Sequence, residues 1–95
     1  MEDVIELGGN IVLEGFKDLD RGEMAVVRKV VGNYAKTMSE KNTNFSKLKV
    51  SMTKENDNLK INAEMTADKA YNGEETGNNL FIAFDSALKK IVEQL

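Results

Sequence analysis

Hydrophobic residues recur along this chain with two different periods, and each period predicts a type of element. Val4 to Leu7 and Ile11 to Leu13 are short β-like runs on either side of Gly8-Gly9-Asn10. These three residues fit a tight hairpin turn or a bulge within one long strand, and we favour the hairpin. The glycine pair does not fit a phosphate-binding loop, because it lacks the following lysine and precedes a strand.

The pattern changes to a helical period after Phe16. Asp20 and Glu23 stand at the spacing of a capping box, which predicts a helix start near Asp20. Apolar residues then recur three and four positions apart and give the helix one apolar face up to about Ser39. Gly32 interrupts this helix at a cost of about 1 kcal/mol relative to alanine. It indicates either close packing or a tolerated defect, and we favour the defect.

The period becomes two behind the polar loop 41–44. Apolar and polar residues alternate over 47–53 and again over 59–66, with turn-forming residues at 55–58 between them. These two segments predict an antiparallel hairpin with one buried face. Residues 67–79 fit a short further strand or a mobile loop, because they hold several turn-forming residues and few large apolar ones.

The end of the chain predicts a second amphipathic helix, capped by Asn78 or Asn79. Its predicted apolar stripe consists of Phe81, Phe84, Leu88, Ile91 and Leu95. The element order predicts an α+β two-layer sandwich, in which two helices cover one face of a mainly antiparallel sheet. With 95 residues, the chain is expected to form a single domain over 1–95.

Residues 79–95, with the sequence NLFIAFDSALKKIVEQL, resemble the closing helix of the ribosome hibernation-promoting factor and ribosome-associated inhibitor family. An aromatic residue, a small apolar pair, an aspartate and a lysine-rich stretch ending in Gln-Leu carry the resemblance. From about Ile11 onward the order of elements is also similar. The resemblance implies a strand, helix, three-strand, helix fold and a surface that binds ribosomal RNA. The chain departs from the family in its longer opening and in lacking a strongly basic character.

Composition narrows the classes of function. The net charge of −3 argues mildly against an undirected nucleic-acid binder, although residues 25–54 carry seven basic side chains and one acidic. The chain has no histidine and no cysteine, so the commonest general bases, nucleophiles and metal ligands are missing. The acidic residues between Glu6 and Glu23 fit no metal-binding loop. We therefore expect no enzyme, no metal and no cofactor.

The sequence also predicts a cytoplasmic protein without a membrane partner. The longest apolar run, Leu80 to Phe84, is five residues long, whereas a membrane-spanning helix needs about 20. The chain opens with Met1-Glu2-Asp3, which is acidic where a secretory signal would be basic.

Two basic clusters are candidate RNA-binding sites. Arg28, Lys29 and Lys36 lie on the polar side of the first predicted helix, where they fit phosphate contacts or a plain solvated face. A second cluster on the open face of the sheet follows from strand alternation. It comprises Lys47, Lys49 and Lys60. Lysines on an exposed sheet also protect against aggregation, so this cluster has a structural interpretation as well.

Two hypotheses of function follow. The first is a small binding domain that docks on ribosomal or other structured RNA through the lysine patch. The alternative is a protein-interaction module, which would form a homodimer or bind a partner through the open sheet face or a sheet edge. A continuous positive surface at Lys47, Lys49 and Lys60 would favour RNA, and neutralisation by Glu64 or Glu55 would count against it.

Overall fold

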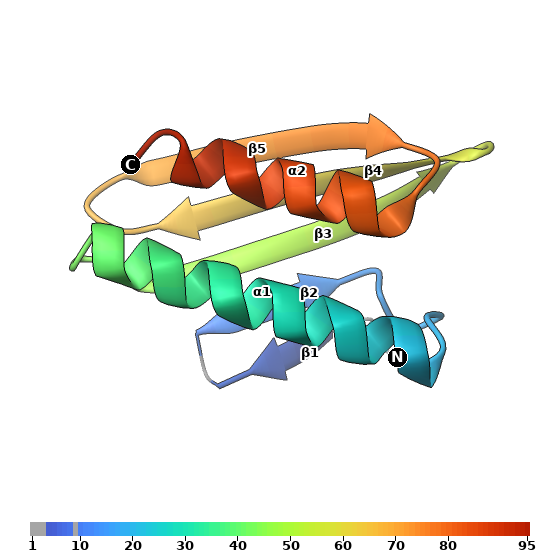
Figure 1. Cartoon of the computed structure of the whole chain (residues 1–95), viewed down its shortest axis with the longest axis horizontal. Helices are drawn as coiled ribbons and strands as arrows, with labels where there is room; N and C mark the ends of the chain where they lie inside the picture. Colours follow the sequence, from blue (N-terminus) through green and yellow to red (C-terminus); the bar gives the residue numbers. More distant parts are fainter. Residues whose placement is uncertain (1–3, 9) are drawn as a thin grey trace.

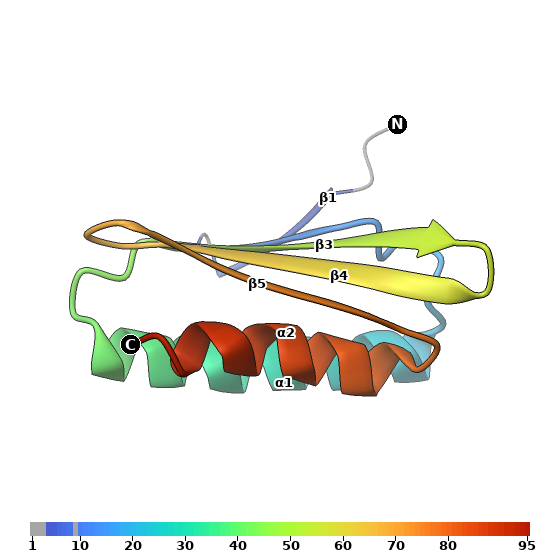
Figure 2. The same ribbon diagram turned by 90° about the horizontal axis from the view of Figure 1, so that it is seen from above.

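Five strands and two helices arrange the chain in two layers in the computed structural model, which describes residues 4–8 and 10–95. The strands are β1 (Val4–Leu7), β2 (Ile11–Glu14), β3 (Lys47–Glu55), β4 (Asn58–Thr66) and β5 (Ala70–Gly77), and the helices are α1 (Arg21–Lys41) and α2 (Leu80–Val92). Both helices lie on the same side of a single sheet (Figure 1 and Figure 2). The predicted α+β sandwich is confirmed.

The strands follow one another across the sheet in chain order. β1 and β2 form the favoured antiparallel hairpin, in which Leu7 pairs with Ile11; Gly9 of its turn lies outside the described residues. β2 and β3 are parallel, because α1 carries the chain back across the sheet between them. β3 and β4 form the predicted hairpin, with Asn56 at a φ of 55° in its turn. In the ambiguous segment 67–79 the strand alternative is correct, since β5 pairs with β4.

The capping box fixes the start of α1. The Asp20 carboxylate accepts a hydrogen bond from the Glu23 amide at 2.7 Å, and the Glu23 carboxylate accepts one from the Asp20 amide at 3.1 Å. The helix continues two residues beyond the predicted end at Ser39, to Lys41. A Cβ atom at Gly32 would meet nothing within 4 Å, which confirms that this glycine is a tolerated defect.

The second helix is capped by Asn79, whose side chain accepts a hydrogen bond from the Ile82 amide at 3.1 Å. Its buried face is rotated from the predicted stripe, because Leu80, Ala83 and Ala87 are buried and Phe81 is 39% exposed. The prediction that Phe81 belongs to the core is wrong. The small residues face the sheet because α2 lies very close to β5 there: a Cβ atom at Gly73 would come within 2.0 Å of the Ala87 carbonyl oxygen.

Contacts between distant segments hold the layers together. Phe16, from the connection before α1, packs edge-on against Phe84 of α2, with ring centroids 5.7 Å apart. The Tyr34 hydroxyl donates a hydrogen bond to the Asp85 carboxylate at 2.7 Å and so joins the two helices. Within the described ranges, no charged or polar residue is buried in the core. In the same ranges, none of the helices is long and apolar enough to cross a membrane.

Candidate functional site

The open face of the sheet carries the lysine cluster where strand alternation predicts it. Leu48, Val50 and Ile61 point into the core, so Lys47, Lys49 and Lys60 lie on the opposite side of β3 and β4. The same alternation brings glutamates to this face from three other positions. They are Glu14 of β2, Glu64 of β4 and Glu74 of β5.

These glutamates neutralise most of the lysine cluster. Lys49 forms an ion pair with Glu14 at 2.8 Å and stands directly opposite Glu64 in the β3–β4 register. The hydrogen bond and charge of Glu14 hold the pKa of Lys49 above its usual value. Lys60 forms a second ion pair, with Glu74 at 3.5 Å. Lys47 is the member of the cluster that has no carboxylate partner among the described residues, so the positive surface is interrupted.

The helix cluster lies on the other layer of the molecule. Arg28, Lys29 and Lys36 are all exposed along α1, and none of them forms an ion pair within the part of the chain that the structure describes. The sheet cluster faces away from the helices, so one flat ligand cannot cover both. Of the two clusters, the structure leaves the helix cluster unneutralised.

A groove between β1 and α1, here called the β1–α1 groove, contains one of these residues, Arg28. The groove has a volume of about 570 Å³. Its lining residues are Ile5, Lys17, Leu19, Asp20, Arg21, Met24, Ala25 and Arg28. The start of β1 is the part of the sheet that lies farthest from the helices in Figure 2. The sheet edge therefore diverges from α1 and leaves the groove between them.

Apolar and basic side chains share this groove. Arg21 and Arg28 are seven positions apart on α1, with Met24 and Ala25 between them, so helical periodicity aligns the four along one flank. Ile5 and Leu19 add apolar surface from β1 and from the connection before α1. Among the described residues, the carboxylate in the lining is that of Asp20, which already accepts a hydrogen bond from the Glu23 amide. The groove therefore suits a ligand that is both anionic and partly apolar.

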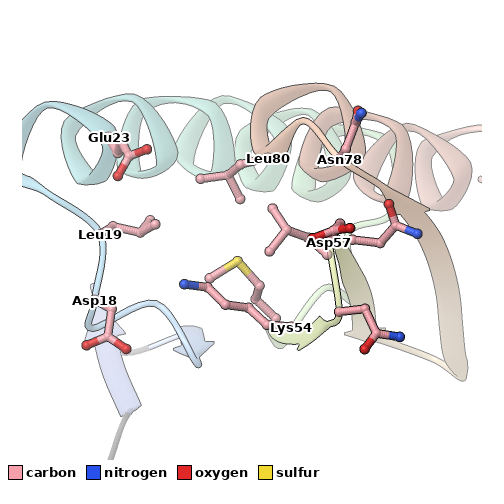
Figure 3. A pocket seen from close by; sticks show the side chains of 11 residues that line it. Asp18, Leu19, Glu23, Lys54, Asp57, Asn78 and Leu80 are labelled. Carbon is pink, nitrogen blue, oxygen red and sulfur yellow. The ribbon is translucent and has the colours of Figure 1, made fainter.

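A second pocket, of about 340 Å³, lies at the end of the sandwich where both helices begin. Leu19, Met52, Leu59 and Leu80 line it together with the polar residues Asp18, Glu23, Lys54, Asn56, Asp57, Asn58 and Asn78. Figure 3 shows the carboxylates of Asp18, Glu23 and Asp57 on different sides of this pocket. No three such groups converge on a metal position in the described ranges, and Glu23 is engaged in the capping box. This pocket has no arrangement that indicates chemistry.

The acidic residues near the start of the chain are dispersed. Glu14 pairs with Lys49 on the open sheet face, whereas Asp20 and Glu23 form the capping box of α1. Asp18 lies on the rim of the second pocket. These four carboxylates therefore lie in separate places and do not form one common site.

No protein-family model matches this chain, and no curated protein matches it. The resemblance of residues 79–95 to the hibernation-factor family stays a prediction that rests on those residues and on the order of elements.

Sequence reasoning did not find the β1–α1 groove. Of the residues that line it, Arg28 was a predicted site residue, whereas Arg21, Ile5 and Met24 were not. The seven-residue spacing of Arg21 and Arg28 was a readable signal for a basic flank on α1. The apolar half of the groove could not be predicted from local sequence patterns, because it depends on the packing of α1 beneath β1.

Proposed function

We propose that this chain is a non-catalytic protein-interaction module whose binding surface is the β1–α1 groove. One observation carries the proposal: the exposed arginines Arg21 and Arg28 lie in a groove with half-buried apolar side chains, whereas the lysines of the open sheet face are mostly paired with glutamates. A surface of this kind supplies both the apolar contact area and the charge complementarity that protein partners use.

The charge balance of the open sheet face argues against RNA binding at that face. A phosphate that approached Lys49 or Lys60 would have to displace a glutamate and would lie beside Glu64. Affinity for nucleic acid depends on releasing counterions from phosphates through unpaired cations. Paired lysines contribute little to that release.

The described groups with perturbed pKa values, Lys49 included, lie outside the β1–α1 groove. The pKa of Tyr34 is raised to about 12 by burial and by the Asp85 carboxylate, and Lys90 lowers the pKa of Glu75. Asp68 has its pKa lowered by a hydrogen bond from Asn42. Each of these groups joins two parts of the fold, and none lines the β1–α1 groove. Perturbed pKa values at catalytic sites, in contrast, gather in a cleft.

RNA docking through the helix cluster is the second candidate function. Arg28, Lys29 and Lys36 are exposed on one side of α1 without ion pairs among the described residues, which is the arrangement that phosphate contacts need. This candidate concerns ribosomal or other structured RNA, as the family resemblance implies.

Site-specific photo-cross-linking in the host cell separates the two functions. A photoreactive amino acid is placed at Ala25, in the groove, and in a second strain at Ser51, on the open sheet face. We expect adducts from position 25 that protease destroys and ribonuclease leaves intact, and no comparable adducts from position 51. In the same background, Arg28→Glu is expected to lower the adduct yield.

The opposite result would replace the proposal. Ribonuclease-sensitive adducts from position 25, together with salt-sensitive co-sedimentation of the protein with ribosomal subunits, would establish RNA docking through the helix cluster. Adducts from position 51 that disappear when Lys47, Lys49 and Lys60 are changed to Glu would instead place the ligand on the open sheet face.

A further inference from the structure

The two edges of the sheet differ in whether another strand can join them. A strand at a sheet edge presents unpaired amide and carbonyl groups at alternate residues, and these groups accept an added strand unless the protein covers them. β5 forms one edge and β1 forms the other. The contacts of each edge therefore decide where a partner can bind by strand addition.

Side chains of α2 and its C-terminal turn close the β5 edge. Lys90 donates a hydrogen bond to the carbonyl oxygen of Glu74 at 2.7 Å, and Gln94 donates one to the carbonyl oxygen of Asn72 at 2.7 Å. Lys90 also pairs with the Glu75 carboxylate at 3.0 Å. Two successive outward carbonyls of β5 are thus already bonded, and an added strand would have to displace both side chains. A homodimer through the β5 edge is disfavoured for the same reason.

The β1 edge is open among the described residues. No side chain and no backbone group outside the hairpin bonds to the backbone of Val4–Leu7 in that part of the chain. Val4 is also 44% exposed. β1 therefore presents alternate amide and carbonyl groups, and the β1–α1 groove lies beneath them on the helical side.

We infer that the groove binds an acidic segment of a partner protein in extended conformation, which adds to the sheet as a strand beside β1. This inference rests on the proposed function. Side chains alternate between the two faces of such a strand, so every second one points toward α1. An apolar side chain there meets Ile5 and Met24, and a carboxylate reaches Arg21 or Arg28 on the same flank.

Charge distinguishes this partner from a second copy of the chain. Two copies joined through their β1 edges would place two basic groove rims side by side, and like charges across an interface oppose association. An acidic segment places carboxylates opposite Arg21 and Arg28 and so favours association. Nucleic acid would satisfy the charges but would leave Ile5, Met24 and Ala25 without apolar contacts.

The test uses the full chain, labelled with ¹⁵N, and a short synthetic peptide in which threonine occupies every second position and valine and aspartate take turns at the positions between, in the order Val-Thr-Asp-Thr-Val-Thr-Asp. Valine and aspartate then share the face that points toward α1. On addition of peptide, we expect saturable changes in the amide chemical shifts of Val4–Leu7 and of the first turns of α1. The amide chemical shifts of β5 are expected to stay unchanged. Arg28→Glu is expected to weaken binding about tenfold or more, which corresponds to about 1.4 kcal/mol. Lys36→Glu, an identical charge change on α1 outside the groove lining, is the matched control and is expected to have a smaller effect.

Backbone methylation of the peptide separates strand addition from simple groove binding. Methyl groups on alternate peptide nitrogens block the hydrogen bonds of one edge of the added strand. One of the two methylation registers is therefore expected to weaken binding about tenfold or more, and the other to retain it. Equal binding in both registers would overturn strand addition and leave the groove as a protein-binding surface.

Two further outcomes would refute the acidic partner segment, and one of them would also refute the proposed function. No shift in β1 or α1 at millimolar peptide would refute the acidic strand, and the cross-linking at Ala25 then decides separately whether the groove binds another protein. Shifts along α1 with a short single-stranded or structured RNA, but none with the peptide, would refute both the inference and the proposed function.

Discussion

Gly73 is a position at which a single added methyl group should lower the stability of the fold strongly. It lies in β5 under α2, and a Cβ atom there would come within 2.0 Å of the Ala87 carbonyl oxygen and 3.3 Å of the Ile91 side chain. The nearest obstacle is helix backbone, which cannot move aside as the end of a side chain can. Gly73→Ala must therefore displace α2 from the sheet.

The size of the effect follows from this displacement. Cβ atoms essentially never approach within 3.0 Å of another heavy atom. The helix must then retreat by about 1 Å, and a gap of that size loses about a quarter to a half of each dispersion contact that it opens. Overpacking of this kind costs typically about 1–3 kcal/mol. For a domain of this length, each kcal/mol lowers Tm by roughly 4–8 °C.

Thermal unfolding followed by circular dichroism measures the change, with Gly32→Ala as the matched control. A Cβ atom at Gly32 meets nothing within 4 Å, so the same substitution there is expected to raise stability by up to about 1 kcal/mol, as helix propensity predicts. A loss of stability in Gly73→Ala together with a gain in Gly32→Ala would support the close packing of α2 on β5. If Gly73→Ala were as stable as the unchanged protein, the close contact between β5 and α2 would be refuted.

Three further predictions concern single interactions. Asp20→Ala removes the capping box and is expected to lower the free energy of unfolding by about 0.5–2 kcal/mol in urea titrations, whereas Asp18→Ala should change it little. The pKa of Tyr34 is raised from 10.0 to about 12 in the folded protein. Its contribution to the free energy of unfolding is therefore fully present below pH 10 and is lost as pH rises toward 12. Tyr34→Phe should make the pH dependence of urea unfolding shallower in that window, and an unchanged slope would contradict the assignment. Lys90→Met is expected to raise the pKa of Glu75 toward its ordinary value, as carboxyl ¹³C shifts would report.

Local patterns were sufficient for most elements of the fold. The capping box located α1, and alternation located the β3–β4 hairpin, because these signals depend on neighbours a few residues apart. The buried face of α2 was misjudged at Phe81. Which stripe of a helix faces the sheet depends on where the backbone can approach closely, and Gly73 sets that point from another element.

For the candidate site, the sequence by itself determined which residues share a face. Alternation placed Lys47, Lys49 and Lys60 together, and helical spacing placed Arg28, Lys29 and Lys36 on the polar side of the first helix. Only the tertiary structure decided which charges remain available. Glu14 and Glu74 reach the lysines because β2 and β5 flank the β3–β4 hairpin, whereas the divergence of β1 from α1 leaves the arginines beside an apolar groove. Charge pairing and grooves depend on contacts between elements far apart in the sequence, and local periodicity does not encode them.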